Sequence, residues 1–400
     1  MTAILTLNAG SSSAKFAVYM ADGDLMRQAQ GQVENIGPTA RLSFQSDGST
    51  RQQAVAANNH AAALGVILDV IEPVLGGRQV AGVGHRVVHG GTDFEGPAYL
   101  TTEVVAKLEA LSPLAPLHQP ANLAGVAAAQ TAFPDAVQVG CFDTAFHRTH
   151  PWVNDTFALP RALYDAGIRR YGFHGLSYDY ITQRLRADAP DIAKGRVVVA
   201  HLGNGASMCA LRDCSSIGST MGFSALDGLP MGTRCGQLDP GVILYLLDQG
   251  YTAEEISALL YKESGLKGLS GISHDMRTLL ESDAAEARQA VDYFTFRLRR
   301  EIGAMTAVLG GIDALVFCGG IGEHAPPIRA GAVRDLAYLG LRVDAAANER
   351  NAAQIGAGPV PIMVIPTDEE RVIAEATRTF LTTARQHRDA AKPQTTRAAQ

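Results

Sequence analysis

Residues 4–20 read ILTLNAGSSSAKFAVYM: an apolar run, a turn of small polar residues and a second apolar run. The two flanking runs predict extended strands, because branched and aromatic residues dominate them. Between them, Asn8–Lys15 combines small residues, which let backbone N–H groups approach a phosphate, with serine hydroxyls and a lysine. It is not a Walker A loop, because the spacing G-x-x-x-x-G-K-[ST] is absent. Such a turn also occurs in plain hairpins, so this stretch alone leaves both interpretations open.

The second half of the chain repeats this pattern. An apolar strand at Arg196–Ala200 leads into the polar, glycine-rich turn His201–Ser207. We therefore expect two structurally related halves that face one cleft, although no close sequence repeat accompanies the pattern.

Strands and helices alternate through the rest of the chain, which favours a mixed α/β architecture. The predicted strands, with the turns that follow them, lie at 80–91, 136–142, 314–318 and 361–365. The predicted helices cover 59–71, 120–129, 239–250 and 284–309. The first helix is expected to stop before Pro73. The segment Gly319–His324 is predicted to be a turn, and Thr252 with Glu255 to form a capping box.

The composition narrows the class of protein. The 400 residues are 46% hydrophobic, enough for a large core divided over two or three domains. A formal net charge of −6 without a basic block argues against nucleic acid and anionic membranes as partners. We see no leader and no run of 18 apolar residues, so no membrane span is expected. The five cysteines include no CxxC pair, which favours reduced thiols in a cytoplasmic protein.

Several ionisable residues lie at predicted strand or helix ends. Arg86 and Arg234 either pair internally or await an anion, because a buried guanidinium without a partner is costly. Two such arginines could hold a carboxylate and a phosphoryl group by bidentate hydrogen bonds. Asp143 could bind a metal, transfer a proton or only cap a helix. Three histidines in matching contexts could stabilise charge on a phosphoryl group in flight: His118, His174 and His201.

Two later turns also follow apolar strands. Gly319–His324 suits the close approach of a nucleotide. Thr367–Glu370 places carboxylates where a hydrated Mg²⁺ could bind through one or two of them. Acidic residues there are equally expected in the first turn of a helix, where the dipole favours them.

Together, and in this order, nine motifs resemble those of the acetate kinase family. They are Leu7–Ser13 with Lys15, Gly84–Gly91, Ala115–His118, Phe142–His147, Tyr171–Gly175, His201–Ser207, Met231–Arg234, Gly319–Glu323 and Pro366–Glu370. The resemblance runs in register over nearly the whole chain.

The resemblance implies an α/β fold of the sugar kinase, actin and heat-shock ATPase superfamily, with two duplicated domains and an interdomain nucleotide cleft. Residues 1–145 with a returning helix at 372–390 would form one domain and 146–371 the nucleotide-binding domain, with a polar tail at 391–400. The implied reaction is acetate + ATP ⇌ acetyl phosphate + ADP with Mg²⁺, for which Mn²⁺ could substitute. A homodimer is also implied.

Matching positions imply residue roles. Asn8 and Glu369 would fix Mg²⁺. Arg86 and Arg234 would hold acetate and the transferred phosphoryl group, and Asp143 is the family's acidic active-site residue. Because acetate is already ionised at neutral pH, no strong base is needed, and we interpret Asp143 as an orienting or metal-linked residue.

The transition state and the substrates have further implied contacts. His174 would stabilise the transition state beside Arg234, with His118 nearby. The ATP contacts would be Lys15, His201, Leu202, Gly203, Asn204, Gly205, Asp275, Met276, Arg277, Gly320, Ile321, Gly322, Glu323 and His324. The walls of the acyl pocket would be Val88, Leu117, Phe173 and Ala225.

The sequence departs from the family pattern in four places. Asp368 and His324 each replace a usual Asn, and Gln237 replaces an acidic residue. Ala225 stands where a pocket Pro is usual, which could enlarge the acyl pocket. A propionate kinase of the same family therefore stays open. An actin- or chaperone-like ATPase is the rival from another class, although it leaves Arg86 and Arg234 without a ligand.

Overall fold

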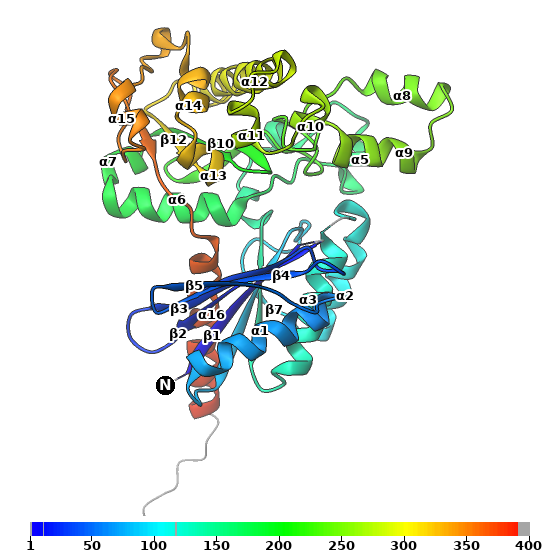
Figure 1. Ribbon diagram of the computed structural model, residues 1–400, viewed down its shortest axis with the longest axis vertical. Helices are drawn as coiled ribbons and strands as arrows, with labels where there is room; N and C mark the ends of the chain where they lie inside the picture. Colours follow the sequence, from blue (N-terminus) through cyan, green and yellow to red (C-terminus); the bar gives the residue numbers. More distant parts are fainter. Residues whose placement is uncertain (1, 11, 117, 391–400) are drawn as a thin grey trace, which may run out of the picture. The chain divides into compact units, whose positions relative to one another are not determined.

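The computed structural model describes residues 2–10, 12–116 and 118–390, so the predicted polar tail at 391–400 lies outside the described residues. The chain divides into two compact units. Unit 1 comprises the described residues up to Ala145 and those from Glu369 onward, and unit 2 comprises Phe146–Asp368. The mixed α/β class predicted from the sequence is confirmed (Figure 1).

Unit 1 contains, within the described ranges, an eight-stranded sheet of order β5-β4-β3-β2-β1-β6-β8-β7. Its strands are β1 (Ala3–Ala9), β2 (Ser13–Met20), β3 (Arg27–Glu34), β4 (Arg41–Ser46), β5 (Ser49–Ala54), β6 (Val80–Val87), β7 (Ala98–Tyr99) and β8 (Val137–Phe142). Its main helices are α1 (His60–Leu75), α2 (Thr102–Ala110), α3 (Gln119–Ala132) and α16 (Glu369–Ala390). Strands β1, β6 and β8 run parallel, and β1 to β5 run antiparallel in sequence.

The alternation of side chains along β1 and β2 explains how the helices cover this sheet. Leu5, Leu7 and Phe16 belong to the core shared with α1, whereas Ile4 and Tyr19 belong to the core shared with α16. Successive side chains of a strand point to opposite faces, so one apolar strand serves both cores. The helices α1 and α3 therefore pack on one face and α16 on the other (Figure 1).

Unit 2 contains, among its described residues, a five-stranded sheet of order β11-β10-β9-β12-β13. Its strands are β9 (Arg196–Leu202), β10 (Ala206–Arg212), β11 (Ser215–Ser219), β12 (Ala314–Cys318) and β13 (Ile362–Val364). Its helices are α4 (Trp152–Asp155), α5 (Arg161–Asp165), α6 (Gly175–Asp188), α7 (Pro190–Ala193), α8 (Pro240–Asp248), α9 (Ala253–Ala258), α10 (Gly265–Ser270), α11 (Met276–Leu280), α12 (Ala285–Leu309), α13 (Gly319–His324), α14 (Pro326–Val333) and α15 (Ala345–Glu349). Helix α6 shares a core with β9, β10 and β12, and α12 also packs against β9, β10 and β11.

The two sheets have the same inner topology. The order β3-β2-β1-β6-β8 in unit 1 corresponds to β11-β10-β9-β12-β13 in unit 2. In both, the first three strands are antiparallel and the last two join in parallel. The expectation of structurally related halves is confirmed, and Asn8 and His201 are the penultimate residues of the equivalent strands β1 and β9.

Two local predictions are wrong. Helix α1 continues through Pro73 and ends only at Gly76, whose left-handed backbone (φ 54°, ψ 42°) lets its N–H donate to Glu72 O at 3.2 Å. A proline removes one backbone hydrogen bond, which the packed face of α1 outweighs. The segment Gly319–His324 is the short helix α13 rather than a turn. By contrast, the capping box of Thr252 and Glu255 is confirmed.

No helix in the described part of the chain is long and apolar enough to cross a membrane.

Glycines of β6 let α16 approach the sheet closely. A Cβ built on Gly84 would come within 2.5 Å of Ile373 Cγ2 and closer still to the Thr377 hydroxyl. We therefore expect Gly84→Ala to lower the free energy of unfolding by about 1–3 kcal/mol through overpacking. The measurement is urea unfolding.

A matched control uses the same change in a helix. Gly65 of α1 is exposed, and a Cβ built on it meets nothing within 4 Å. Gly65→Ala should raise the free energy of unfolding by about 0.5–1 kcal/mol, because glycine is a poor helix former. Equal unfolding midpoints for both variants would contradict the close packing of α16 on β6.

Candidate active site

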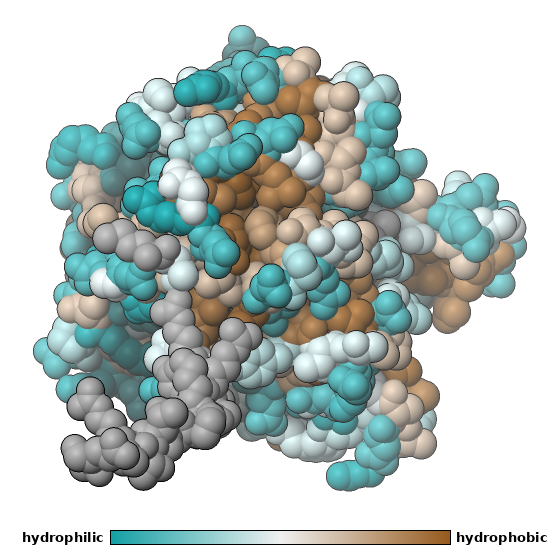
Figure 2. All heavy atoms as spheres, turned by 90° about the horizontal axis from the view of Figure 1, so that it is seen from below, coloured by the Kyte–Doolittle hydropathy of each residue, from teal (hydrophilic) through white to brown (hydrophobic). Residues whose placement is uncertain are grey.

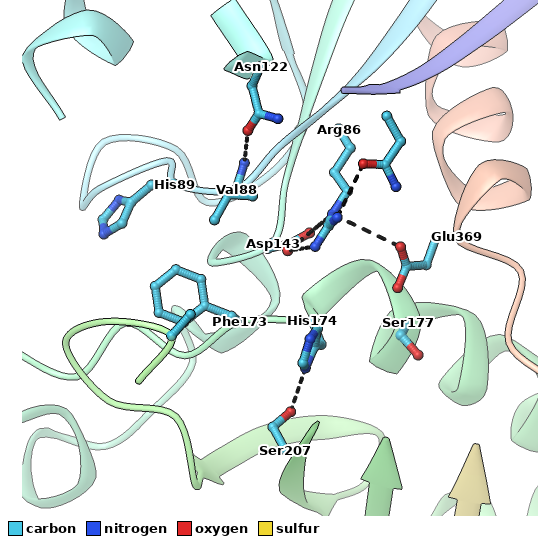
Figure 3. Close-up of polar contacts among 12 residues, drawn as sticks. Arg86, Val88, His89, Asn122, Asp143, Phe173, His174, Ser177, Ser207 and Glu369 are labelled. Carbon is cyan, nitrogen blue, oxygen red and sulfur yellow. Dashed lines mark hydrogen bonds and ion pairs between the residues drawn. The ribbon is translucent and has the colours of Figure 1, made fainter. Parts of the chain in front are cut away.

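The carboxyl ends of the parallel strands in unit 1 bring three polar side chains together. Asn8 lies near the end of β1, Arg86 near the end of β6, and Asp143 directly after β8. Arg86 Nε donates to Asp143 Oδ1 at 2.9 Å, and Nη2 donates to Asp143 Oδ2 at 2.6 Å (Figure 3). Arg86 Nη1 donates to Asn8 Oδ1 at 3.2 Å. This edge of an α/β sheet is where such folds bind ligands.

Neighbouring carboxylates stabilise the charged form of the Arg86 guanidinium. Its side chain is 20% exposed and that of Asp143 only 1%. Burial alone would lower the pKa of Arg86, but the negative charges of Asp143, Glu369 and Glu370 raise it well above its usual range. Of the two alternatives that the sequence left open for Arg86, the structure shows internal pairing with a bidentate carboxylate.

Helix α16 adds a further carboxylate to this cluster. Glu369 is its first residue, and Glu369 Oε2 lies 4.0 Å from Arg86 Nε. An acidic residue is favourable in the first turn of a helix. Asn8, Arg86, Asp143 and Glu369 therefore form one polar cluster in unit 1, which we call the arginine cluster.

Two buried amides on α3 fix the loop after β6. Asn122 Oδ1 accepts a hydrogen bond from Val88 N at 2.9 Å, and Asn122 Nδ2 donates to Ala9 O (Figure 3). Gln119 accepts from His89 N at 3.2 Å and donates to His89 O at 3.0 Å. Sequence analysis missed both amides. The sequence signal for these residues was a pair of amides one helical turn apart, the first of which directly follows the predicted site residue His118.

The other site residues predicted in unit 1 are His118, Val88, Lys15 and Leu117. His118 is the N-cap of α3, and Val88 is buried. Lys15 is exposed on β2, directly opposite Asn8 in the antiparallel pair. Leu117 lies outside the described residues.

In unit 2, imidazoles and hydroxyls meet at the equivalent sheet edge. His174 Nδ1 lies 2.8 Å from Ser207 Oγ (Figure 3), and the rings of His174 and His201 stack with centroids 4.3 Å apart. His201 Nδ1 lies 2.8 Å from Ser177 Oγ, which in turn lies 2.8 Å from Thr367 Oγ1. We call these five residues the imidazole cluster. Sequence analysis predicted both histidines and missed the role of Ser177.

His174 and Arg234 converge on one point. A Cβ built on Gly205 would lie 3.1 Å from His174 Nε2 and 3.2 Å from Arg234 Nη2. Only glycine leaves that space open, so the turn Gly203–Gly205 presents its backbone to both side chains. The structure therefore brings together three of the residues predicted for phosphoryl transfer and ATP binding.

A π-helical turn at Leu259–Glu263 and the start of α10 hold the turn that carries Arg234. Thr233 Oγ1 donates to Tyr261 O at 2.8 Å, and Leu266 N donates to Met231 O at 2.9 Å. Arg234 Nη1 donates to Ala225 O at 2.9 Å. The backbone of Ala225, predicted as a pocket residue, thus orients the guanidinium. A π-helical insertion often marks a functional segment.

Helix α13 is fixed at both ends. Gly319 has φ 76°, and its N–H donates to Glu323 Oε1 at 2.9 Å. The same oxygen accepts from Thr367 N at 3.2 Å, which ties the turns after β12 and β13 together. At the other end, the fully buried Arg329 donates to Gly322 O at 2.9 Å and Glu323 O at 3.0 Å. These contacts explain why the predicted turn is a helix.

The remaining predicted nucleotide contacts are spread over unit 2. Asp275 is the N-cap of α11 and pairs with Arg277 at 2.9 Å. Asn204 O accepts from Gly232 N at 3.1 Å. The other residues predicted to contact ATP are Leu202, Met276, Gly320, Ile321 and His324, of which Leu202 and Met276 are buried.

The model of the acetokinase family matches residues 3–375. The acetate kinase of Methylocella silvestris is 53% identical over 394 residues, covering 94% of this chain and 98% of that protein. The acetate kinase of Rhizobium meliloti is 50% identical over 387 residues, covering 94% and 98%. Among solved structures, a propionate kinase from Francisella tularensis aligns with a TM-score of 0.90 at 35% identity, covering 95% of this chain and all of that one. The acetate kinase of Porphyromonas gingivalis aligns with a TM-score of 0.86 at 37% identity, covering 95% and 100%.

Proposed function

Because the chain belongs to the acetokinase family, we propose that it is an acetate kinase, which transfers the γ-phosphoryl group of ATP reversibly to acetate. The observation that supports this function most directly is the arginine cluster at the carboxyl ends of β1, β6 and β8. An actin- or chaperone-like ATPase has no carboxylate acceptor and gives that cluster no substrate.

Phosphoryl transfer requires alignment and neutralisation of charge more than it requires acid–base chemistry. Arg86 holds the acetate carboxylate and Arg234 the transferred phosphoryl group. His174 Nε2 stabilises the charge that develops on the equatorial oxygens, because it converges with Arg234 on Gly205. Asp143 orients Arg86, since both of its oxygens accept hydrogen bonds from that guanidinium. Acetate is ionised at neutral pH, so no group has to remove a proton from it.

The donors near Arg86 fit Mg²⁺. Asn8 and Glu369 offer amide and carboxylate oxygens, which this hard cation prefers. Within the described residues no group of three or more His, Cys, Asp or Glu side chains could hold a metal by itself. That agrees with Mg²⁺, which usually takes one or two carboxylates and completes its shell with water and substrate phosphates. When bound, the cation neutralises phosphate charge; Mn²⁺ is a possible substitute.

The nucleotide contacts are assigned to backbone-rich segments. The segments that would contact ATP are Lys15, the turn His201–Gly205, Asp275–Arg277 and Gly320–His324. Glycine-rich turns admit phosphates close to backbone N–H groups. An ATP-dependent reaction and cysteines that are free in the described chain suit a cytoplasmic enzyme.

Steady-state kinetics with acetate, propionate and butyrate, in both directions, tests the function. We expect acetate to give acyl phosphate, trapped as hydroxamate. We also expect kcat/KM for propionate within about a thousandfold of that for acetate, because one methylene is worth only about 1–3 kcal/mol of discrimination.

Ala225→Pro is the matched variant for acyl selectivity, since Ala225 stands at the proposed acyl pocket, and proline keeps the backbone carbonyl that accepts from Arg234. It should lower propionate activity more than acetate activity. A higher kcat/KM for propionate than for acetate in the wild type would reassign the chain as a propionate kinase. ATP hydrolysis without any acyl phosphate would support the ATPase alternative.

Glu369→Gln tests the metal assignment. Removing this charge should raise the Mg²⁺ concentration for half-maximal rate roughly 10–100-fold, the scale seen when a supporting carboxylate of a metal site is lost. Glu375→Gln is the control, because Glu375 lies on the same helix and pairs with Arg371. An unchanged Mg²⁺ dependence in Glu369→Gln would refute the assignment.

The surface of unit 2 supports a homodimer. Helix α8 has no buried residue, and Leu244 and Tyr245 are 64% and 62% exposed. Apolar surface is visible on the protruding part of unit 2 that carries α8 and α9 (Figure 2). Large apolar side chains exposed next to one another on a helix favour contact with another protein. A second copy of the chain is the occupant we propose.

Sedimentation velocity at micromolar concentration should show a dimer for the wild type. Leu244→Glu should shift it toward monomer, because a charge in an apolar interface is left without a partner. Met26→Glu, on unit 1 and 60% exposed, is the control and should leave the dimer intact. A monomeric wild type would contradict the assignment.

A further inference from the structure

The backbone at His174 is strained and needs support. His174 has φ 58° and ψ 24°, the left-handed region, and it caps α6 without a side-chain hydrogen bond to the helix. A non-glycine residue there is strained, and it persists only where the surroundings determine it. The preceding peptide, between Phe173 and His174, is therefore expected to have a fixed partner.

That partner is the buried His147. Its Nε2 lies 2.9 Å from Phe173 O, and its ring lies against Gly172, where a Cβ would be 2.6 Å from His147 Cγ. Gly172 itself has φ 74°. His147 thus contacts both residues that precede His174, and it belongs to a motif, Phe142–His147, in which only Asp143 has so far been given a role.

The hydrogen bonds determine the tautomer of His147. Phe173 O can only accept, so Nε2 carries the proton and Nδ1 is an acceptor. His147 Nδ1 lies 2.8 Å from Ser216 Oγ, which must therefore donate its one proton to it. Ser216 Oγ then has only lone pairs left for its other neighbours.

Those neighbours can both donate. His150 Nε2 lies 2.8 Å from Ser216 Oγ, and Cys209 Sγ lies 3.2 Å from it. Burial raises the pKa of Cys209 to about 12, so its thiol keeps its proton. Burial lowers the pKa of His147 to about 3 and that of His150 to about 4, so both rings are neutral at neutral pH. The hydrogen bonds of this group then all run one way. His150 and Cys209 donate to Ser216, Ser216 donates to His147, and His147 donates to Phe173 O.

We propose that His147 is a positioning residue: the relay His150–Ser216–His147 holds its N–H on Phe173 O and so sets the backbone that carries Phe173 and His174. This inference rests on the proposed function, in which His174 acts on the transferred phosphoryl group, and on the place at the acyl pocket that the family resemblance implies for Phe173. The side chains of Phe173 and His174 branch from the two Cα atoms that flank this peptide. A loss of the relay therefore changes the chemical step and acyl recognition, while the contacts to ATP stay intact.

Ser216→Ala removes the hydroxyl that donates to His147 Nδ1, so only the contact with Phe173 O is left to hold the tautomer. We expect kcat to fall about tenfold and KM for acetate to rise, with KM for Mg–ATP within about twofold. Cys209→Ala is the matched control: it truncates another buried neighbour of Ser216 but leaves the proton direction unchanged, so its kcat should stay near wild type. A second pair, His147→Gln and His147→Leu, separates hydrogen bonding from packing, because glutamine keeps an N–H donor. His147→Gln should retain more kcat than His147→Leu.

A spectroscopic measurement reads the tautomer directly. In ¹⁵N-histidine-labelled full-length protein, His147 should show the Nε2–H tautomer, and Ser216→Ala should shift its resonances toward a mixture. A wild-type Nδ1–H tautomer, or equal kcat in Ser216→Ala and Cys209→Ala, would overturn the inference. A wild type that forms no acyl hydroxamate would instead overturn the proposed function. The measured tautomer of His147 would in that case still test whether the relay His150–Ser216–His147 exists.

Discussion

The buried ion pair between Arg86 and Asp143 is the interaction on which the polar edge of unit 1 depends. Burying a carboxylate that is 1% exposed is costly without an opposite charge, and the Arg86 guanidinium supplies that charge through a bidentate contact. The pair forms because β6 and β8 are parallel and in register, with Arg86 beside Cys141, so that Asp143 follows two residues later. Asn8 joins from the neighbouring β1. The site is thus a consequence of strand order.

Unit 2 uses the same strand order for a different purpose. Its equivalent edge carries hydroxyls and imidazoles, with Ser177 bridging His201 and Thr367. Here the turns after β12 and β13 are tied by Glu323, which accepts backbone N–H groups from both. One duplicated topology therefore provides a charged cluster in one unit and a hydrogen-bonding cluster in the other.

The sequence predicted what depends on local pattern. The strand runs, the glycine-rich turns and the polar residues at strand ends are readable because each signal lies within a few residues of the feature it determines. Asn122 bonds residues 34 and 113 positions away, and Gln119 bonds His89, 30 positions away, so the sequence did not reveal these roles. Likewise, the helix at Gly319–His324, which was predicted as a turn, accepts hydrogen bonds from Arg329, a residue outside that segment. Pro73 stays helical because tertiary packing outweighs its local preference.

The charge of the arginine cluster bears on how the proposed reaction uses it. Arg86 contributes one positive charge, whereas Asp143 and Glu369 contribute two negative charges. An anionic acetate would meet net repulsion at such a cluster, because Asp143 already neutralises the guanidinium. In the proposed function, the requirement for Mg²⁺ therefore follows from electrostatics as well as from nucleotide chemistry. A divalent cation held by Asn8 and Glu369 would make the net charge of the cluster positive, and Arg86 could then orient a second carboxylate.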